Sequence, residues 1–292
     1  MMTIEQKQKV VSEMLKRREL FGGSDAKFAT SLGINSAQYS RVKNGELEKV
    51  LSDQVWISIA RKFNVQLREE AQWNIAKTPV FEFITGQLEM CQEESISAMI
   101  CDLADIGKTV TARHYARTHK NAVLIDCSQV KTKRAFIKQI AREFGLDTDG
   151  KYADVYANLV YYIKTIEKPL IIMDEAGDLQ YEAFLEIKSL WNATEGACGF
   201  YMMGADGLEA KFRRSIDNKK VGYTEIFRRF GKRYSKAVPE GEDKNKFLNA
   251  NAQMIIKANA KPGADINKIL RCIMDENGVP SITRIERELA KL

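Results

Sequence analysis

The feature that most constrains the fold is an apolar run that leads into a glycine-lysine-threonine loop and then a helix, over residues 97–117. SAMIC is apolar enough for a buried strand, DLADIGKT has the composition of a loop, and VTARHYAR begins a helix. This order is the structural context of a P-loop. Backbone N–H groups at the helix N-terminus hold phosphates, Lys108 adds positive charge, and Thr109 can ligate Mg²⁺. The sequence therefore predicts a site for ATP and Mg²⁺.

The loop departs from the pattern GxxxxGK[ST] at its first position and carries a second carboxylate. Gly107 precedes Lys108 as the pattern requires, but Asp102 stands at the first glycine position and Asp105 within the loop. A carboxylate beside a triphosphate repels it unless the carboxylate points away or faces Mg²⁺. Two alternatives follow: a degenerate site with weak ATP binding, or a working site whose two aspartates are turned elsewhere.

A second acidic motif lies downstream in KPLIIMDEAGDL, residues 168–179. This apolar strand ends in Asp174 and Glu175, at the order and distance expected of a Walker B element. Asp174 is predicted to support Mg²⁺, and Glu175 is predicted to orient or deprotonate the attacking water. An apolar strand ending in two acids is also typical of a plain buried strand, so the prediction depends on the loop upstream.

Two more apolar runs, NAVLIDC at 121–127 and ACGFYMMGA at 197–205, alternate with helical segments. This alternation favours a parallel sheet with right-handed crossovers, and therefore the α/β class. Ligands of such sheets bind at the carboxyl ends of the strands. We expect Lys108, Asp174 and Asp206 to meet there.

Residues 81–292 resemble the AAA+ ATPase family, on the GKT loop, the DE pair and an arginine-rich box, EIFRRFGKRY, at 225–234. The resemblance implies a parallel-sheet core and a small C-terminal helical lid. It also implies a polar γ-phosphate sensor after the next strand, an arginine supplied to the neighbouring subunit, and a lid arginine in PSITRIERELAKL. The candidates are Asp206, with Ala205 as the alternative alignment, Arg228 or Arg229, and Arg284.

Glycines divide the N-terminal segment into short helices, and residues 25–44 have a helix-turn-helix pattern. Ala29 is small where two helices meet, Gly33 tolerates a positive φ, and apolar positions follow. The segment resembles the Cro/repressor-type helix-turn-helix family. An ordinary helical bundle, or a helix-turn-helix that contacts protein, is the alternative. The resemblance implies that the second helix contacts DNA. The implied contacts are Ser36, Gln38, Ser40, Arg41 and Lys43.

Composition shifts and breaker residues predict four parts. QLREEAQWNIAKTPV has mixed polarity and ends in Thr-Pro, which disfavours a continuing helix and marks a linker. The last part has three helical segments separated by glycine and proline, as in a helical lid. The predicted parts are a helix-turn-helix domain at 1–65, a linker at 66–80, an AAA+ core at 81–240 and a lid at 241–292.

Charge is concentrated rather than spread evenly. The net charge is +6, but residues 211–236 hold ten Lys and Arg against two acids, a local net charge of +8. Such a stretch can bind phosphates through counterion release, although it is also found on ordinary solvated faces. No apolar run reaches the length of a membrane span, and the five cysteines show no CxxC pair, so we expect a cytoplasmic protein without a zinc site. The candidate DNA contacts are Lys211, Arg213, Arg214, Lys219 and Lys220.

The order of a repressor-like module and a compact AAA+ ATPase resembles the transposition target-selection ATPases of the Mu phage B protein type. The resemblance implies slow ATP hydrolysis and ATP-dependent self-association into rings or filaments. It also implies binding to double-stranded DNA with little sequence preference, and delivery of that DNA to a transposase. A helicase loader of the same fold is one alternative. A non-catalytic helix-turn-helix transcription regulator with a degenerate P-loop is the other.

Overall fold

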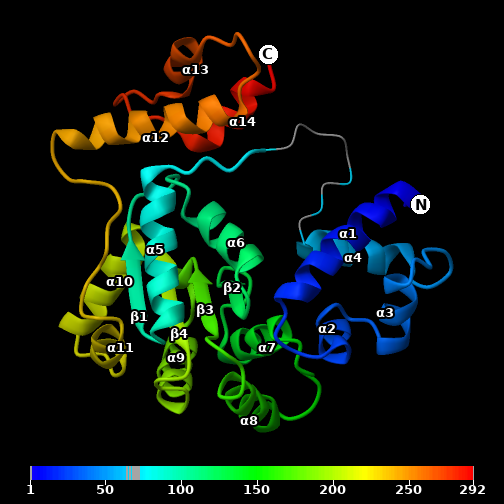
Figure 1. Cartoon of the computed structure of the whole chain (residues 1–292). Coiled ribbons are helices and arrows are strands. Elements are labelled where there is room, and N and C mark those ends of the chain that lie inside the picture. The colour runs from blue at the N-terminus through cyan, green and yellow to red at the C-terminus, as the bar shows by residue number, and fades with distance from the viewer. Residues whose placement is uncertain (1, 64, 66, 68–72, 292) are drawn as a thin grey trace.

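A sheet of four parallel strands forms the centre of the molecule (Figure 1). The computed structural model describes residues 2–63, 65, 67 and 73–291. Within these ranges the strands lie in the order β1-β4-β3-β2, and every neighbouring pair is parallel. Parallel neighbours need crossover connections, which the helices supply, so the predicted α/β class is confirmed. The strands are β1 (Ser97–Cys101), β2 (Ala122–Asp126), β3 (Leu170–Asp174) and β4 (Gly199–Gly204).

Alternation along each strand divides the core into two layers. In β3, Leu170 and Ile172 pack into one layer, and Ile171 and Met173 pack into the other. The first layer is covered by α5 and α6, and the second by α7 to α11. Both faces of the sheet are therefore buried, as the apolar strands require. The helices are α5 (Pro79–Glu93), α6 (Lys108–Thr118), α7 (Lys133–Glu143), α8 (Tyr152–Ile163), α9 (Tyr181–Ala193), α10 (Asp206–Asp217) and α11 (Tyr223–Arg229).

The first four helices form a separate unit with its own hydrophobic cluster, which we call the N-terminal unit. Phe28, Tyr39 and Trp56 are among its buried side chains. Thr3 and Asn35 form capping boxes that fix the starts of α1 and α3, because each side chain accepts a bond from an otherwise unpaired backbone N–H. The helices are α1 (Ile4–Leu20), α2 (Asp25–Ser31), α3 (Ser36–Lys43) and α4 (Asp53–Phe63).

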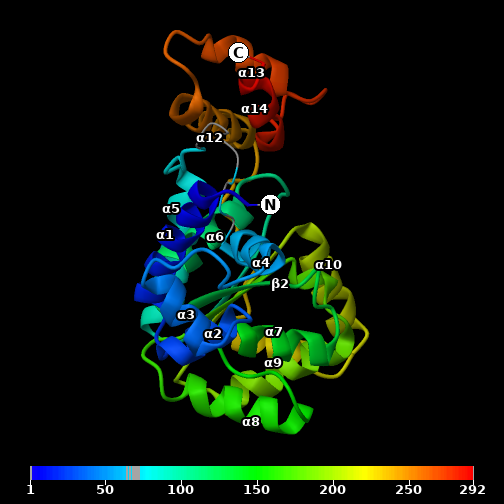
Figure 2. The ribbon, with the colours of Figure 1, turned by 90° about the vertical axis from the view of Figure 1, so that its right-hand side faces the viewer.

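The N-terminal unit rests on the side of the core that carries β2 (Figures 1 and 2). Helix α1 contacts α6, and α2 contacts α7. A guanidinium N–H of Arg117 donates to the carbonyl oxygen of Phe63 over 2.8 Å. The ammonium of Lys27 lies 4.0 Å from the ring centre of Tyr162. Helix α3 is not part of this contact, and most of its side chains are exposed.

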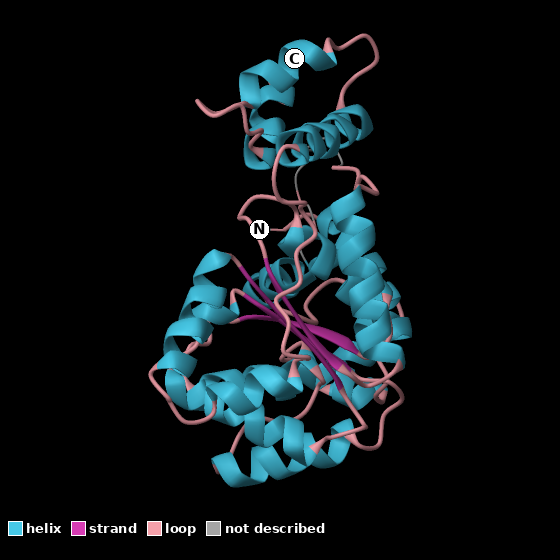
Figure 3. Ribbon diagram, turned by 90° about the vertical axis from the view of Figure 1, so that its left-hand side faces the viewer, coloured by secondary structure: helices cyan, strands magenta, loops and turns pink. Residues whose placement is uncertain are grey.

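Three helices at the C-terminal end form a small unit, which we call the lid, over the core on the side of α5 and α6 (Figures 1 and 3). They share a small cluster of buried side chains, which includes Ile256, Ile273 and Ile285. None of the helices in the described ranges is long and apolar enough to cross a membrane. The lid helices are α12 (Asp243–Asn259), α13 (Ile266–Ile273) and α14 (Ile282–Leu289).

The segment before α5 contacts the lid through Trp73 and Asn74. The backbone N–H of Asn74 donates to the side-chain oxygen of Asn259 over 2.7 Å, and the amide of Asn259 donates back to the Asn74 carbonyl over 3.0 Å. Trp73 packs against the lid cluster. Of the predicted linker, residues 66 and 68–72 lie outside the described residues, and its last two residues already belong to α5.

The close packing of β4 against α5 makes a stability prediction. A Cβ atom at Gly199 would lie 2.2 Å from the carbonyl oxygen of Cys91, which is backbone and cannot rotate away. We expect Gly199→Ala to lower the free energy of unfolding by about 1–3 kcal/mol, as overpacking does. Gly207→Ala is the matched control, because a Cβ there meets nothing within 4 Å. Thermal unfolding should place the Gly199 variant well below both wild type and the control.

Candidate functional site

The loop between β1 and α6 has the backbone geometry of a phosphate-binding loop. Gly107 has a φ of 98° and occupies the N-cap position of α6 without any side-chain cap. Asp105, with a φ of 58°, also adopts the left-handed conformation that non-glycine residues rarely take. The first N–H groups of α6 are therefore left without a capping side chain. A phosphate group fits this arrangement of backbone donors.

The side chain of Lys108 lies inside its own loop. Its ammonium donates to the carbonyl oxygens of Asp102 over 2.9 Å and Leu103 over 2.5 Å. Burial lowers the pKa of Lys108, while the carboxylates of Asp102 and Glu175 act in the opposite direction. The ammonium is buried at the same loop as the free N–H groups of α6, which suits the binding of an anion.

The metal-ligating candidates meet at the end of β3. The hydroxyl of Thr109 bonds to the carboxylate of Asp174, and this bond opposes the rise in the Asp174 pKa that burial causes. Asp126, the last residue of β2, lies in register with Asp174 and is a further candidate that sequence analysis missed. Its signal was present, because the run 121–127 carries an aspartate at its carboxyl end. A hydroxyl and a carboxylate are oxygen donors of the kind that Mg²⁺ takes together with phosphate oxygens.

Glu175 follows Asp174 in a sharp turn. Its φ of 50° is left-handed, and it precedes the short 3₁₀ helix η1 (Ala176–Asp178). Burial, and then the charge of Asp174, raises the pKa of Glu175. Lys211 holds the turn by donating to the carbonyl oxygens of Gly177 and Leu179, both over 2.7 Å. A carboxylate with a raised pKa, on a residue with a strained backbone, is typical of a group that accepts a proton.

The two loop aspartates are turned away from the free N–H groups of α6. One oxygen of Asp102 accepts the backbone N–H groups of Ala237 and Val238, over 2.6 and 2.9 Å. The carboxylate of Asp105 accepts the hydroxyl of Ser281 over 2.8 Å and both the N–H and the hydroxyl of Thr283, over 3.0 and 2.6 Å. Of the two alternatives drawn from the sequence, this geometry favours a working site whose aspartates are turned elsewhere. The contact of Asp105 joins the loop to the lid.

The predicted sensor and lid residues each lie in the first turn of a helix. Asp206 opens α10 directly after β4 and is exposed. Arg284 lies in the first turn of α14 and is exposed, next to the Thr283 that Asp105 binds. The Asp105 contact therefore brings the backbone of Arg284 to the phosphate loop.

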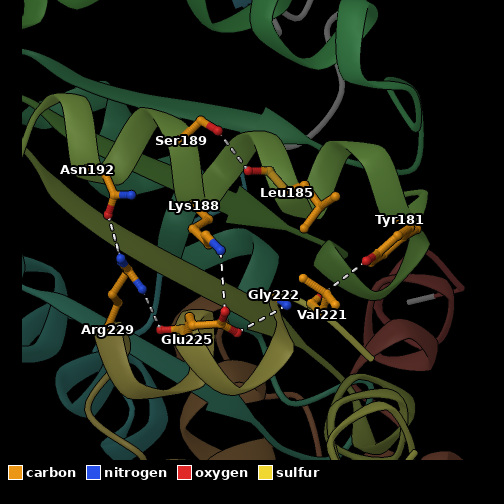
Figure 4. Close-up of polar contacts among 9 residues, drawn as sticks. All are labelled: Tyr181, Leu185, Lys188, Ser189, Asn192, Val221, Gly222, Glu225 and Arg229. Carbon is orange, nitrogen blue, oxygen red and sulfur yellow. Dashed lines mark hydrogen bonds and ion pairs between the residues drawn. The ribbon is translucent and has the colours of Figure 1, made fainter. Parts of the chain in front are cut away.

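The two arginines of the box differ in their surroundings. Arg229 donates to the side-chain oxygen of Asn192 over 2.6 and 3.0 Å (Figure 4). Its guanidinium lies 4.9 Å from the ring centre of Trp191. Neighbouring Glu225 pairs with Lys188 of α9, 3.4 Å away (Figure 4). Arg228 is exposed, and within the part of the chain that the structure describes its side chain has no hydrogen bond or ion pair.

The side chains predicted to contact DNA fall on two surfaces. On α3, Ser36 and Ser40 are exposed, Gln38 is half-buried, and the two cations form surface ion pairs, Arg41 with Glu46 and Lys43 with Asp25. Such pairs contribute little and are readily exchanged for another anion.

The second surface lies on and after α10. Arg213 pairs with Glu209, while Arg214 and Lys219 are exposed. Lys220 lies over the ring of Tyr181, 4.1 Å from its centre. Lys211 instead makes the contacts within the chain described above, so its ammonium is occupied by the turn after Glu175.

Part of the chain is similar to a known family of protein domains. The family model described as AAA domain matches residues 97–212, from the start of β1 to the middle of α10. Residues 97–212 are thus similar to AAA domains, and we refer to this part of the chain as the AAA domain. The phosphate loop, Asp174 and Glu175 all fall within it, and this family assignment supports nucleotide binding and an ATPase class of activity.

Two further matches, one in sequence and one in structure, cover more of the chain than the AAA domain does. Over 199 residues the chain is 26% identical to the Mu-like prophage FluMu DNA transposition protein B of Haemophilus influenzae, an alignment that covers 66% of this chain and 68% of that protein. The solved structure of the Aeropyrum pernix Orc1 protein in complex with DNA is similar with a TM-score of 0.54 at 12% identity. That match covers 75% of this chain and 60% of the Orc1 chain, so the chain spans less than two thirds of it. It supports the AAA+ fold.

The Asp105 carboxylate either supports nucleotide binding through its contact with the lid or weakens binding by repelling phosphate. Two substitutions distinguish these effects. Asp105→Gly removes the bonds to Ser281 and Thr283 without backbone strain. We expect nucleotide affinity to fall roughly fivefold, as when a helix loses a capping side chain worth about 1 kcal/mol. Asp105→Asn keeps an acceptor, tolerates the left-handed backbone and loses only the charge, so it should stay within about twofold of wild type. Nucleotide titration of the three proteins measures this; tighter binding by both variants would instead identify repulsion.

Proposed function

We propose that this protein is an ATP-dependent, DNA-binding regulator of DNA transposition that acts in the cytoplasm. The observation that carries the proposal is the similarity to a DNA transposition protein B over two thirds of the chain. The AAA domain supplies the nucleotide-dependent part of the proposal. In this proposal the nucleotide is ATP. ATP binding and ATP hydrolysis switch the protein between two states of assembly on DNA.

The nucleotide site divides the work among four side chains. Lys108 and the N–H groups of α6 bind the phosphates, and phosphate oxygens replace the two carbonyls that Lys108 now contacts. Thr109 and Asp174 are the residues that would hold Mg²⁺, which on binding neutralises phosphate charge. Glu175 orients the attacking water and accepts its proton, a role that its raised pKa favours. In this proposal Asp206, at the start of α10, and Arg284, in the lid, also contact the nucleotide.

Self-association completes the site in this proposal. The side chain of Arg228 is exposed and without a polar partner in the described part of the chain, so it is available to the nucleotide of a neighbouring subunit. The guanidinium of Arg229 donates to Asn192 of α9 within the same chain, and this contact stabilises α11. Rings or filaments are both compatible with one subunit donating an arginine to the next.

DNA binding is proposed for the two surfaces described above. In this proposal the exposed positions of α3 contact DNA, while the N-terminal unit stays on the AAA domain through α1 and α2. Arg214 and Lys219 belong to the basic stretch, where phosphate contacts carry no sequence preference. We propose that assembly on such DNA presents it to a transposase, which also stimulates ATP hydrolysis.

The proposal predicts that ATP controls assembly on DNA. Lys108→Ala should lose nucleotide binding and ATP-dependent particle growth on nonspecific duplex DNA. Glu175→Gln should still assemble but hydrolyse ATP roughly 10²–10⁴-fold more slowly, the usual contribution of a general base. Light scattering with and without DNA, together with phosphate release, measures both. Assembly on DNA that ignores ATP and both substitutions, with protection of a single palindromic site, would instead indicate a non-catalytic transcription regulator.

The two arginines give a second prediction. Arg228→Ala should reduce ATP hydrolysis by roughly 10³-fold at full nucleotide affinity, because a trans-acting arginine stabilises only the transition state. Arg229→Ala should instead lower thermal stability, because it breaks the contacts with Asn192 and Trp191. Mixing Arg228→Ala with Lys108→Ala should restore hydrolysis, since intact sites then receive intact arginines. No recovery on mixing, from two folded variants, would contradict action between subunits.

A further inference from the structure

A cavity of about 350 Å³ lies between the N-terminal unit and the AAA domain. Its walls come from α1 and α4 on one side and from α6 and the end of α7 on the other. A volume of this order matches the lower end of small-ligand sites. Five cations line it, three from the N-terminal unit and two from α6. They are Arg17, Arg61, Lys62, Arg113 and Arg117.

These cations outnumber the acids that face them. Glu143 lines the cavity and lies 3.5 Å from Lys62, and Glu13 pairs with Arg17 over 2.9 Å. The side chains of Arg61 and Arg113 have no hydrogen bond or ion pair within the described part of the chain. With both acids counted, three positive charges remain uncompensated around one partly open cavity.

Some of this charge is held away from water. The side chain of Arg17 is only 12% exposed, and burial lowers its pKa. Burial also lowers the pKa of Arg117, and the positive charges of Arg17 and Arg113 lower it further. Cations from two structural units thus repel one another across their contact, and a bound anion would relieve this repulsion.

The donors that remain free suit neighbouring phosphate groups. Arg117 uses one guanidinium nitrogen for the Phe63 carbonyl, and its remaining N–H groups are available. Guanidinium groups bind phosphate oxygens in pairs, and four of the five cations are arginines. Phe28, Phe63 and Phe144 add apolar surface to the same cavity. An anion with a charge between about −2 and −4 balances the uncompensated charge.

We propose that this cavity is a second anion site, for a small ligand with two or three linked phosphate groups, distinct from the phosphate loop. The ligand would contact the N-terminal unit through Arg17 and Arg61 and the AAA domain through Arg113 and Arg117. It would therefore stabilise the contact between the two units. Linked phosphates occur in free polyphosphates and nucleotides, and spaced phosphates occur along a nucleic-acid backbone, so the test separates these sources.

The test uses the full chain with Lys108→Ala, which weakens the phosphate loop, and pyrophosphate as the probe. Arg61 and Arg113 are both exposed, so Arg61→Gln/Arg113→Gln can be made without opening the core. Arg134→Gln/Arg271→Gln is the matched control, because it removes the same charge from two exposed helix positions that do not line the cavity. Calorimetric titration gives the affinity, and the thermal midpoint with saturating pyrophosphate gives a second readout.

We expect the cavity variant to bind pyrophosphate at least roughly tenfold more weakly than the parent, since each charge-assisted bond is worth about tenfold or more. The control should stay within about twofold, and Arg61→Lys/Arg113→Lys should recover part of the loss. Equal affinities of cavity variant and control, or no pyrophosphate binding by the parent, would overturn the proposal. A short DNA duplex is the second probe. Displacement of pyrophosphate by the duplex would assign the site to backbone phosphates, and no displacement would assign it to a free ligand. Neither result depends on ATP hydrolysis or on a transposase.

Discussion

The buried carboxylate of Asp102 is the contact on which the arrangement of the nucleotide site depends. It is 2% exposed and accepts the N–H groups of Leu103, Ala237 and Val238, which compensate a charge that burial would otherwise make costly. The first of these bonds shapes the loop, and the other two fix the segment that leads to the lid. Lys108 binds the backbone oxygen of the same aspartate. The loop and the segment that leads to the lid are therefore positioned by one residue that the usual motif would replace with glycine.

Local patterns made part of this structure predictable. Thr3 and Ser24 cap helices where the sequence places a short polar side chain before an amphipathic run, and Asp174 ends a wholly buried strand. The direction of Asp105 was not predictable, because its partners Ser281 and Thr283 lie far away in the sequence. No local pattern could show such a partner.

Charge along the sequence proved a poor guide to charge in space. Within the stretch 211–236, Lys211 is bound to backbone carbonyls and Arg213 to Glu209, so part of the local surplus is satisfied inside the AAA domain. By contrast, Arg17 and Arg117 belong to no basic run, yet the fold brings them to one cavity. Only the docking of the N-terminal unit on α6 creates that concentration, and it involves helices that are distant in sequence.

Helix α6 has a mechanical consequence for the whole chain. Its eleven residues span about 16 Å as a rigid rod, with the phosphate loop at one end and the Arg117–Phe63 bond near the other. A tilt of about 4° at the loop displaces the far end of such a rod by about 1 Å. The same helix therefore links the loop directly to α4, through the bond between Arg117 and Phe63.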